Sequence, residues 1–188
     1  MKVLLLPNII AILWGASELV VLMTMRAKPG SMLKDRRSLA AIWVVYPLTI
    51  WLAVFTAFAA QAWALHQSEV FRLLGLIIFL MGQSFRWYSI YYLGRYFTAN
   101  VAISPDHRLI ESGPYRFIRH PSYTGNFIAV IGFGLSLANM ASLLVVMVPT
   151  FAVHLWRMRI EERALLEAFG DEYRNYMART KRLVPFVY

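Results

Sequence analysis

The segment from Gly113 to Gly125 holds the densest group of polar and ionisable side chains that could bind a ligand or take part in a reaction in this 188-residue chain. It contains two arginines, a histidine, two tyrosines and a serine, and it lies between stretches that are strongly apolar. Polar groups beside a hydrocarbon environment need partners or a wet cavity, because an unpaired polar group is costly there. The segment is therefore the first place to expect a bound ligand.

A second candidate is the pair Arg157 and Glu161, which lie four residues apart in a stretch of good helix formers. This spacing puts both side chains on one face of a helix, while Arg159 and Glu162 are expected to point elsewhere. Two interpretations are open. The pair is either a surface ion pair worth about a few tenths of a kcal/mol, or a cation and an anion that meet two different groups of one ligand.

Two histidines of the same region give a weaker indication of a site. A lone histidine most often makes a structural hydrogen bond, but His107 and His120 lie close together in the sequence. We expect no metal site, because the chain has no cysteine and no histidine cluster at the spacing of zinc ligands. Pro121 suits the first turn of a helix, whose free N–H groups near Ser122 and Tyr123 could hold a carboxylate or phosphate.

The composition is that of an integral membrane protein. Hydrophobic residues make up 59% of the chain and charged residues 15%, unlike an ordinary soluble domain. The net charge of +9 does not indicate nucleic acid as a partner, because basic residues of membrane proteins gather in cytoplasmic loops and contact lipid headgroups. No glycine-rich dinucleotide motif and no P-loop is present, which excludes a soluble Rossmann-type enzyme.

Five apolar stretches predict five transmembrane helices. The last two are short and are separated by a tight turn at Asn139, so we expect them to form a helical hairpin. Glu18 and Arg86 lie inside two of the predicted spans, where a charge must face protein or water, and the two could pair within the bundle. The spans run approximately over residues 3–25, 39–65, 70–92, 123–137 and 141–156.

The basic residues predict the orientation of these spans. Lysine and arginine cluster in residues 26–37, 95–119 and 157–182, whereas the two other connections have none. This pattern predicts an N-terminus outside and C-terminal helices in the cytoplasm, in an inner or plasma membrane if the source is prokaryotic. In the tail, we expect a left-handed Gly170 to end one helix and Asp171 to cap a second one that reaches about Arg179.

The motifs in the C-terminal half resemble those of the isoprenylcysteine carboxyl methyltransferase family, in the same order and with the same spacing. In the loop they are His107-Arg108-Leu109-Ile110, Gly113-Pro114-Tyr115, and Arg119-His120-Pro121-Ser122-Tyr123 with Gly125. In the tail they are Arg157, Glu161-Glu162, Phe169-Gly170, Glu172-Tyr173, Tyr176 and Leu183-Val184-Pro185-Phe186.

This resemblance implies a membrane-embedded methyltransferase that uses S-adenosyl-L-methionine. It implies that Arg157 and Glu161 carry catalysis and that Arg157 faces the carboxylate of the acceptor, with Arg119 as a further candidate for substrate binding. The residues expected to bind the cofactor are His107, Arg108, Leu109, Ile110, Tyr115, His120, Pro121, Ser122, Tyr123 and Glu161.

The chain is then expected to be one all-α domain over residues 1–188, with an N-terminal three-span part, 1–93, and a cofactor-binding part, 94–188. The membrane setting favours a lipid-tailed acceptor, above all an isoprenylcysteine-like carboxylate, that enters laterally between helices. A carboxylate is ionised at neutral pH and needs no general base. Membrane lipids are the other expected partner, and the oligomeric state is not predicted.

Three alternatives remain open. A phospholipid N-methyltransferase would share the cofactor but methylate an amine, and would need a base such as His120 or Glu162. An NADPH-dependent sterol reductase also resembles the C-terminal region, but normally has more spans. A non-catalytic membrane binding or transport protein is disfavoured, because no inverted repeat is present.

Overall fold

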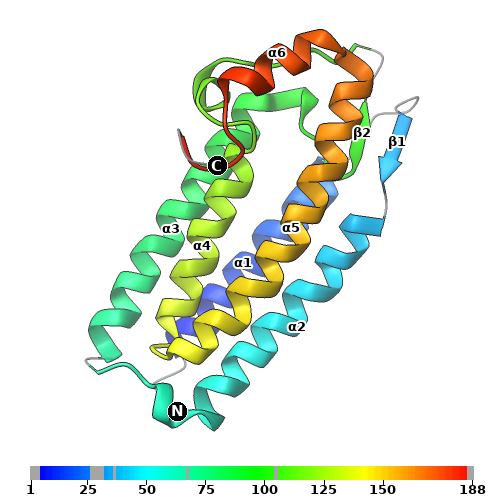
Figure 1. Ribbon diagram of the computed structural model, residues 1–188. Coiled ribbons are helices and arrows are strands. Elements are labelled where there is room, and N and C mark those ends of the chain that lie inside the picture. Colours follow the sequence, from blue (N-terminus) through cyan, green and yellow to red (C-terminus); the bar gives the residue numbers. More distant parts are fainter. Residues whose placement is uncertain (1–4, 26–31, 36, 67, 104–105, 186–188) are drawn as a thin grey trace.

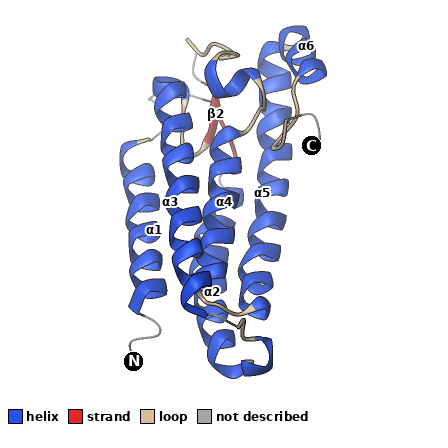
Figure 2. Ribbon diagram, turned by 90° about the vertical axis from the view of Figure 1, so that its left-hand side faces the viewer, coloured by secondary structure: helices blue, strands red, loops and turns tan. Residues whose placement is uncertain are grey.

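The computed structural model describes residues 5–25, 32–35, 37–66, 68–103 and 106–185. Five helices, α1 to α5, run side by side, and the short helix α6 lies across one end of them (Figures 1 and 2). The helices are α1 (Leu5–Thr24), α2 (Arg37–Ala59), α3 (Ser68–Leu93), α4 (Pro121–Ser136), α5 (Met140–Phe169) and α6 (Asp171–Arg179). Two short strands, β1 (Met32–Asp35) and β2 (Val101–Ile103), and three 3-10 turns, Gln61–Trp63, Gly94–Tyr96 and Gly113–Arg116, complete the fold.

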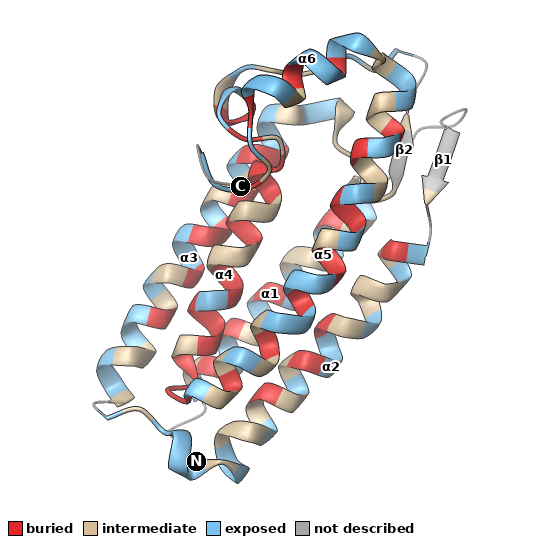
Figure 3. Ribbon diagram, viewed as in Figure 1, coloured by how far each residue is buried: buried red, intermediate tan, exposed pale blue. Residues whose placement is uncertain are grey.

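Four of the helices, α1, α2, α3 and α5, are long and apolar enough to cross a membrane. Buried positions lie on the inner faces of the bundle and exposed positions on the outer faces (Figure 3). The outer faces carry large apolar side chains such as Trp51, Leu73 and Met81, each more than half exposed. Apolar exposure on this scale needs a nonpolar surrounding. The chain is therefore a multi-pass integral membrane protein.

The predicted helices are found close to their predicted positions, but the second is shorter than expected. The sequence predicts a span to residue 65, whereas α2 ends at Ala59. The following residues bond instead to the turn between α4 and α5: Asn139 Nδ2 donates to the Ala60 carbonyl at 2.9 Å, and Leu65 N to the Ala138 carbonyl at 2.9 Å. These bonds replace the helical ones, so the helix stops. The predicted α4–α5 hairpin is confirmed.

The predicted fifth span and the predicted tail helix form one continuous helix, α5. Gly170 follows it with a φ of 52°, as expected for a glycine stop. The prediction that Asp171 caps the next helix is wrong. Gly170 occupies the cap position, and Asp171 is the first residue of α6, where its carboxylate pairs with Arg174 one turn later.

The β1–β2 pair is a feature that the sequence does not predict. Met32 lies opposite Ile103 and Leu33 opposite Ala102 in an antiparallel register. Strands this short have no periodic pattern to recognise. The pair joins the connection between α1 and α2 to the segment that follows α3, at the end of the bundle where α6 lies (Figure 1).

Glycines let α3 and α4 touch along their backbones. A methyl group added at Gly82 would lie 2.3 Å from the backbone nitrogen of Ala129, and Gly75, Gly125 and Gly132 are as close to the facing backbone, at 2.3 to 2.5 Å. Small residues such as these allow either a helix or a ligand to approach α4 closely. Gly125 and Gly132 admit α3, which is the small-residue packing common between membrane helices.

Helix α1 is attached to the bundle through Trp14 and Glu18. The Trp14 ring is packed edge-on against Tyr46 of α2, at 5.0 Å between centroids, and lies 5.9 Å from Phe133 of α4. One helical turn further on, Glu18 Oε2 accepts from Arg86 Nη2 of α3 at 2.9 Å. The sequence left open whether the two intramembrane charges pair, and the structure shows that they do.

Replacing Gly82 by alanine is expected to lower the melting temperature of the purified protein, because the added methyl group would overlap the backbone of α4. Overpacking of this kind costs about 1–3 kcal/mol. The matched control is Gly15→Ala on α1, where a methyl group meets no atom within 4 Å. Thermal unfolding in detergent measures both variants, and equal melting temperatures would contradict the close contact.

Candidate active site

A cavity with a volume of about 360 Å³ connects the α6 end of the bundle with the facing sides of α1 and α2. This volume is within the range of small-molecule sites. One end of the cavity is polar and is formed by the loop before α4, the first turn of α4 and the later turns of α5. The other end is mainly apolar and includes Gly15 and Leu22 of α1 and Ile42, Trp43 and Ile50 of α2.

Two tyrosines and a glycine fix the loop that forms the polar end. Tyr115 is buried, and its hydroxyl donates to the Ser89 carbonyl of α3 at 3.2 Å. Tyr176 of α6 donates in turn to the carbonyl of Tyr115 at 2.7 Å. Gly113 has a φ of 57° and lies against the ring of Tyr92, where a side chain would overlap. The loop is therefore clamped between α3 and α6.

The segment that follows α6 runs alongside the start of α4. Arg119 N donates to the Lys181 carbonyl at 2.7 Å, and His120 N donates to the Arg182 carbonyl at 3.0 Å. The tail motif of the sequence thus lies against the loop motif. Phe186, the last residue of that tail motif, is outside the described residues.

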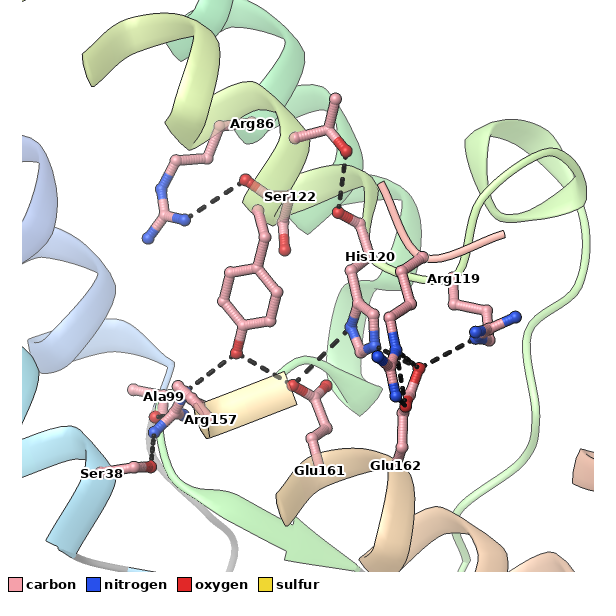
Figure 4. Close-up of polar contacts among 12 residues, drawn as sticks. Ser38, Arg86, Ala99, Arg119, His120, Ser122, Arg157, Glu161 and Glu162 are labelled. Atoms are coloured by element: carbon pink, nitrogen blue, oxygen red, sulfur yellow. Dashed lines mark hydrogen bonds and ion pairs between the residues drawn. The ribbon is translucent and has the colours of Figure 1, made fainter. Parts of the chain in front are cut away.

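Arg157 is buried at the polar end, only 4% exposed. Its Nε donates to the Tyr123 hydroxyl at 2.9 Å, its Nη1 to Ser38 Oγ at 3.0 Å, and its Nη2 to the Ala99 carbonyl (Figure 4). Each terminal nitrogen keeps one further N–H. Burial excludes the interpretation as a surface ion pair and leaves a cation held by three separate segments of the chain.

The Tyr123 hydroxyl links Arg157 to Glu161. It accepts from Arg157 and donates to Glu161 Oε2 at 2.9 Å, so the expected cation and anion are bridged by a tyrosine (Figure 4). The Glu161 side chain is 33% exposed, and its Oε2 lies 4.0 Å from His120 Nδ1. The Glu161 carboxylate therefore lines the cavity beside Tyr123 and His120 and can accept further hydrogen bonds.

Glu162 points away from Arg157, as expected, but into a buried cluster. Its carboxylate accepts from Arg119 Nε at 3.0 Å and from Arg182 Nη2 at 2.6 Å, and its Oε1 lies 3.3 Å from His120 Nε2 (Figure 4). The three partners come from the loop, from the residue before α4 and from the C-terminal segment. One carboxylate thus joins three parts of the chain to α5.

Arg119 also uses its guanidinium to hold the end of α6. Its Nη1 donates to the Met177 carbonyl at 3.2 Å and to the Thr180 carbonyl. With Glu162, these contacts account for an anchoring role of the side chain. Its expected role in substrate binding stays a prediction.

His107 lies between the ring of Tyr96, at 5.3 Å, and the ring of Phe169, at 5.6 Å. Burial lowers the pKa of His107 below its ordinary value, and the charges of Asp106 and Glu161 oppose this only in part. The imidazole is therefore neutral at neutral pH. An uncharged ring at this position can contact a ligand without repelling a cationic group.

The cavity brings together nearly all of the residues expected to bind the cofactor, together with Arg157 and Arg119. The exception is Pro121, which begins α4 as its predicted helical role requires but does not line the cavity. Their individual roles stay predictions. The expected residues that line the cavity are His107, Arg108, Leu109, Ile110, Tyr115, His120, Ser122, Tyr123 and Glu161.

Four contributors to this end of the cavity were not predicted. Ser38 and the carbonyl of Ala99 hold Arg157, but neither belongs to a recognisable motif. Arg182 completes the cluster around Glu162. Tyr173 lines the cavity, and its buried hydroxyl has no hydrogen-bond partner within the described part of the chain. Tyr173 stands in one of the tail motifs, which could have identified it.

Comparison with known proteins gives the family. The model of the isoprenylcysteine carboxyl methyltransferase (ICMT) family matches residues 74–167, which is half of the chain and runs from α3 to the last turns of α5. The chain belongs to the isoprenylcysteine carboxyl methyltransferase family. The family match includes the loop, the start of α4 and the segment of α5 with Arg157, Glu161 and Glu162.

Curated relatives agree with this assignment. The protein-S-isoprenylcysteine O-methyltransferase of Saccharomyces cerevisiae is 34% identical over 116 residues, which cover 61% of this chain and 48% of the relative. Protein-S-isoprenylcysteine O-methyltransferase B of Arabidopsis thaliana is 37% identical over 120 residues, covering 60% of this chain and 58% of the relative. The chain spans about half the length of the curated relatives it matches.

A solved structure is also similar. The eukaryotic intramembrane Ras methyltransferase ICMT matches with a TM-score of 0.57 and 29% sequence identity, over 80% of this chain and 52% of that one. Since the matched share of this chain extends beyond the family model, the similarity includes part of the bundle outside residues 74–167.

Replacing Glu162 by glutamine is expected to destabilise the protein strongly, because Arg119 and Arg182 would lose the charge that compensates them. Breaking a buried ion pair from one side costs about 3–5 kcal/mol. The control is the neighbouring Glu161→Gln, where the carboxylate is one-third exposed and the change should be small. Thermal unfolding in detergent compares the two, and an equal effect would contradict the buried cluster.

The neutral His107 predicts a loss of stability in weak acid. Its pKa is lower in the folded protein than in the unfolded chain, so the unfolded chain binds the proton first. The stability is complete above the unfolded pKa of about 6.5 and declines as the pH falls below it. His107→Gln should flatten that decline in melting temperature between about pH 7.5 and 5.5. Identical pH profiles for His107→Gln and the parent chain would refute the prediction.

Proposed function

We propose that this chain transfers the methyl group of S-adenosyl-L-methionine to the carboxylate of a lipid-tailed acceptor of the isoprenylcysteine type. One observation carries the proposal: a single cavity joins a polar end, with Arg157, Tyr123 and Glu161, to an apolar end between α1 and α2. A carboxylate and its hydrocarbon tail require these two surroundings next to each other. Family membership and the names of the relatives support the same chemistry.

The polar end fits the cofactor. Glu161 is a partly exposed carboxylate that could hold the ammonium group, and the unpartnered Tyr173 hydroxyl could donate to the carboxylate group. Burial raises the pKa of Tyr173, which keeps that hydroxyl protonated. Leu109 and Ile110 supply apolar surface to the same space. When bound, the cofactor supplies an electrophilic methyl group that needs neither an acid nor a metal.

Arg157 is the residue that would hold the acceptor. Its planar guanidinium has one free N–H on each terminal nitrogen, which suits two-point binding of a carboxylate. With the carboxylate held there, one of its oxygens would take the methyl group that S-adenosyl-L-methionine supplies, and the electrons of the carbon–sulfur bond would stay on sulfur. No proton is transferred, because the carboxylate is already ionised.

An amine acceptor is less well supported. It requires a base, and the candidates from the sequence were His120 and Glu162. The two contact each other, and Glu162 also accepts from Arg119 and Arg182. A buried carboxylate surrounded by cations holds a proton poorly, so the site is better suited to a carboxylate acceptor.

The five-span topology is part of the proposal, with the N-terminus outside and the polar end of the cavity facing the cytoplasm. The described parts of the three basic segments reach the α6 end of the bundle, and the two uncharged connections lie at the other end (Figure 1). Helix α4 would be the additional span that brings the number to five. Its 16 residues extend about 24 Å, less than a hydrocarbon core of ~30 Å, but it packs against α3 and α5.

The whole chain, 1–188, acts as one unit in this proposal. Both parts of the chain line the cavity, since α1 and α2 supply the apolar end and residues after 93 supply most of the polar end. The acceptor tail would enter laterally between α1 and α2.

The proposal is tested by label transfer from S-adenosyl-L-methionine, with protein in lipid nanodiscs and N-acetyl-S-farnesylcysteine or phosphatidylethanolamine as acceptor. We expect a methyl ester on the farnesylcysteine, which alkali releases as methanol. Arg157→Lys should lower kcat/KM about tenfold or more, because the two-point contact is lost. Arg159→Lys, the same change at an exposed position, should have no effect.

Three results would contradict this proposal. Label that resists alkali and lies on phosphatidylethanolamine would show an amine acceptor. The absence of any labelled lipid would refute methyl transfer. Full activity of Arg157→Lys would refute only the proposed role of the Arg157 guanidinium, not the methyl transfer itself.

A further inference from the structure

Three buried polar atoms where α1 faces α3 have no hydrogen-bond partner among the residues described: Trp14 Nε1, Glu18 Oε1 and Arg86 Nε. All three residues line the cavity. Trp14 is 1% exposed and Arg86 is 7% exposed, so bulk water does not reach these groups freely. Unpaired polar atoms are costly in such a place, and an ionisable residue inside a membrane bundle usually has a function.

The ion pair between Glu18 and Arg86 is made through one contact only. Arg86 Nη2 donates to Glu18 Oε2 at 2.9 Å, and Nη1 lies 3.5 Å from the Ser122 carbonyl. In a two-point pair, Arg86 Nε would also donate to Glu18 Oε1. That second bond is missing, so Arg86 Nε keeps an unused donor and Glu18 Oε1 an unused acceptor within the described part of the chain. If the ion pair served only to hold α1 against α3, forming this second hydrogen bond would make the pair more stable.

Trp14 adds a second donor on the same side of α1. It lies one turn before Glu18, and residues four apart share a helical face. The indole N–H, the guanidinium Nε–H and the carboxylate oxygen are therefore two unpaired donors and one unpaired acceptor on residues that line the cavity. The charges of Glu18 and Arg86 cancel, so this group of atoms suits an uncharged ligand.

These atoms lie deeper in the bundle than Arg157. Glu18 is six residues before the end of α1, and Arg86 is seven before the end of α3, which places both roughly 10 Å inside the bundle. Arg157, in contrast, is bonded to Ser38, the second residue of α2. A ligand whose carboxylate is at Arg157 would pass Trp14, Glu18 and Arg86 with its tail.

We propose that Trp14, Glu18 and Arg86 form a subsite that binds a hydroxyl group carried on the lipid tail of the acceptor. A hydroxyl donates one hydrogen bond and accepts two, which matches one carboxylate oxygen and two N–H groups. It would donate to Glu18 Oε1 and accept from Arg86 Nε and Trp14 Nε1. The inference rests on the proposed function, since it assumes an acceptor with a carboxylate and a tail in this cavity.

The test is a binding measurement without cofactor, so that it does not depend on turnover. The probes are unsubstituted stearate and a series of stearates that carry one hydroxyl at successive positions, each displacing a fluorescent fatty acid from protein in nanodiscs. We expect one position to bind about tenfold more tightly than stearate. Neighbouring positions should show less or no gain.

Trp14→Phe should reduce that preference severalfold, because it removes the indole N–H and keeps an aromatic ring. The matched control is Trp87→Phe, since Trp87 is outside the cavity lining and its N–H is already bonded to Ser17 at 2.8 Å. Glu18→Gln gives a second variant of similar size and should also reduce the preference.

Three results would overturn the subsite: no binding of any stearate, equal affinity for every member of the series, or a preference that survives both Trp14→Phe and Glu18→Gln. Equal affinity would mean that water satisfies these atoms. A hydroxyl preference without methyl transfer would support the subsite and refute the proposed reaction. Methyl transfer without the hydroxyl preference would support the proposed reaction and refute the subsite.

Discussion

The carboxylate of Glu162 is the contact on which the polar end of the molecule depends. The buried carboxylate pairs with Arg119, His120 and Arg182, which belong to the loop, the residue before α4 and the C-terminal segment. A carboxylate buried there without these partners would be strongly destabilising, because a buried charge needs a paired partner. The position of Tyr123 follows from this cluster, since it stands one turn after His120 on the helix that the cluster anchors.

Arg157 connects the two halves of the chain in the way that Glu162 connects the segments of the polar end. It is on α5, but two of its three partners, Ser38 and Ala99, come from α2 and from the segment before β2. The apolar end of the cavity is built from α1 and α2. A single guanidinium thus sets how the apolar part of the cavity is placed relative to the polar part. At the polar end, the charged groups of Glu162 and Arg157 are therefore each bonded to several segments of the chain.

Much of this architecture could be predicted from the sequence, because hydropathy and helix-stop residues act locally. The helices, the α4–α5 hairpin and the glycine after Phe169 were all accessible in this way, whereas the pairing of Glu18 with Arg86 was only a possibility. The early end of α2 was not, because it depends on Asn139, which is distant in the sequence. The same difference between local and distant signals holds for the candidate active site. Its motif residues were found, whereas Ser38 and the Ala99 carbonyl were not, because their importance comes only from where the fold places them.

The close contact between α3 and α4 has a consequence for how this family can diverge. The family model begins and ends within α3 and α5, so it contains the glycine seam, the loop and the residues around Arg157. Helices α1 and α2 lie outside it, yet they supply the apolar end of the cavity. Under the proposed function, the residues around Arg157 that would bind the acceptor carboxylate lie within the matched half, and the helices that would hold its tail lie outside it. Changes in α1 and α2 could then alter which tail fits while the residues around Arg157 stay the same.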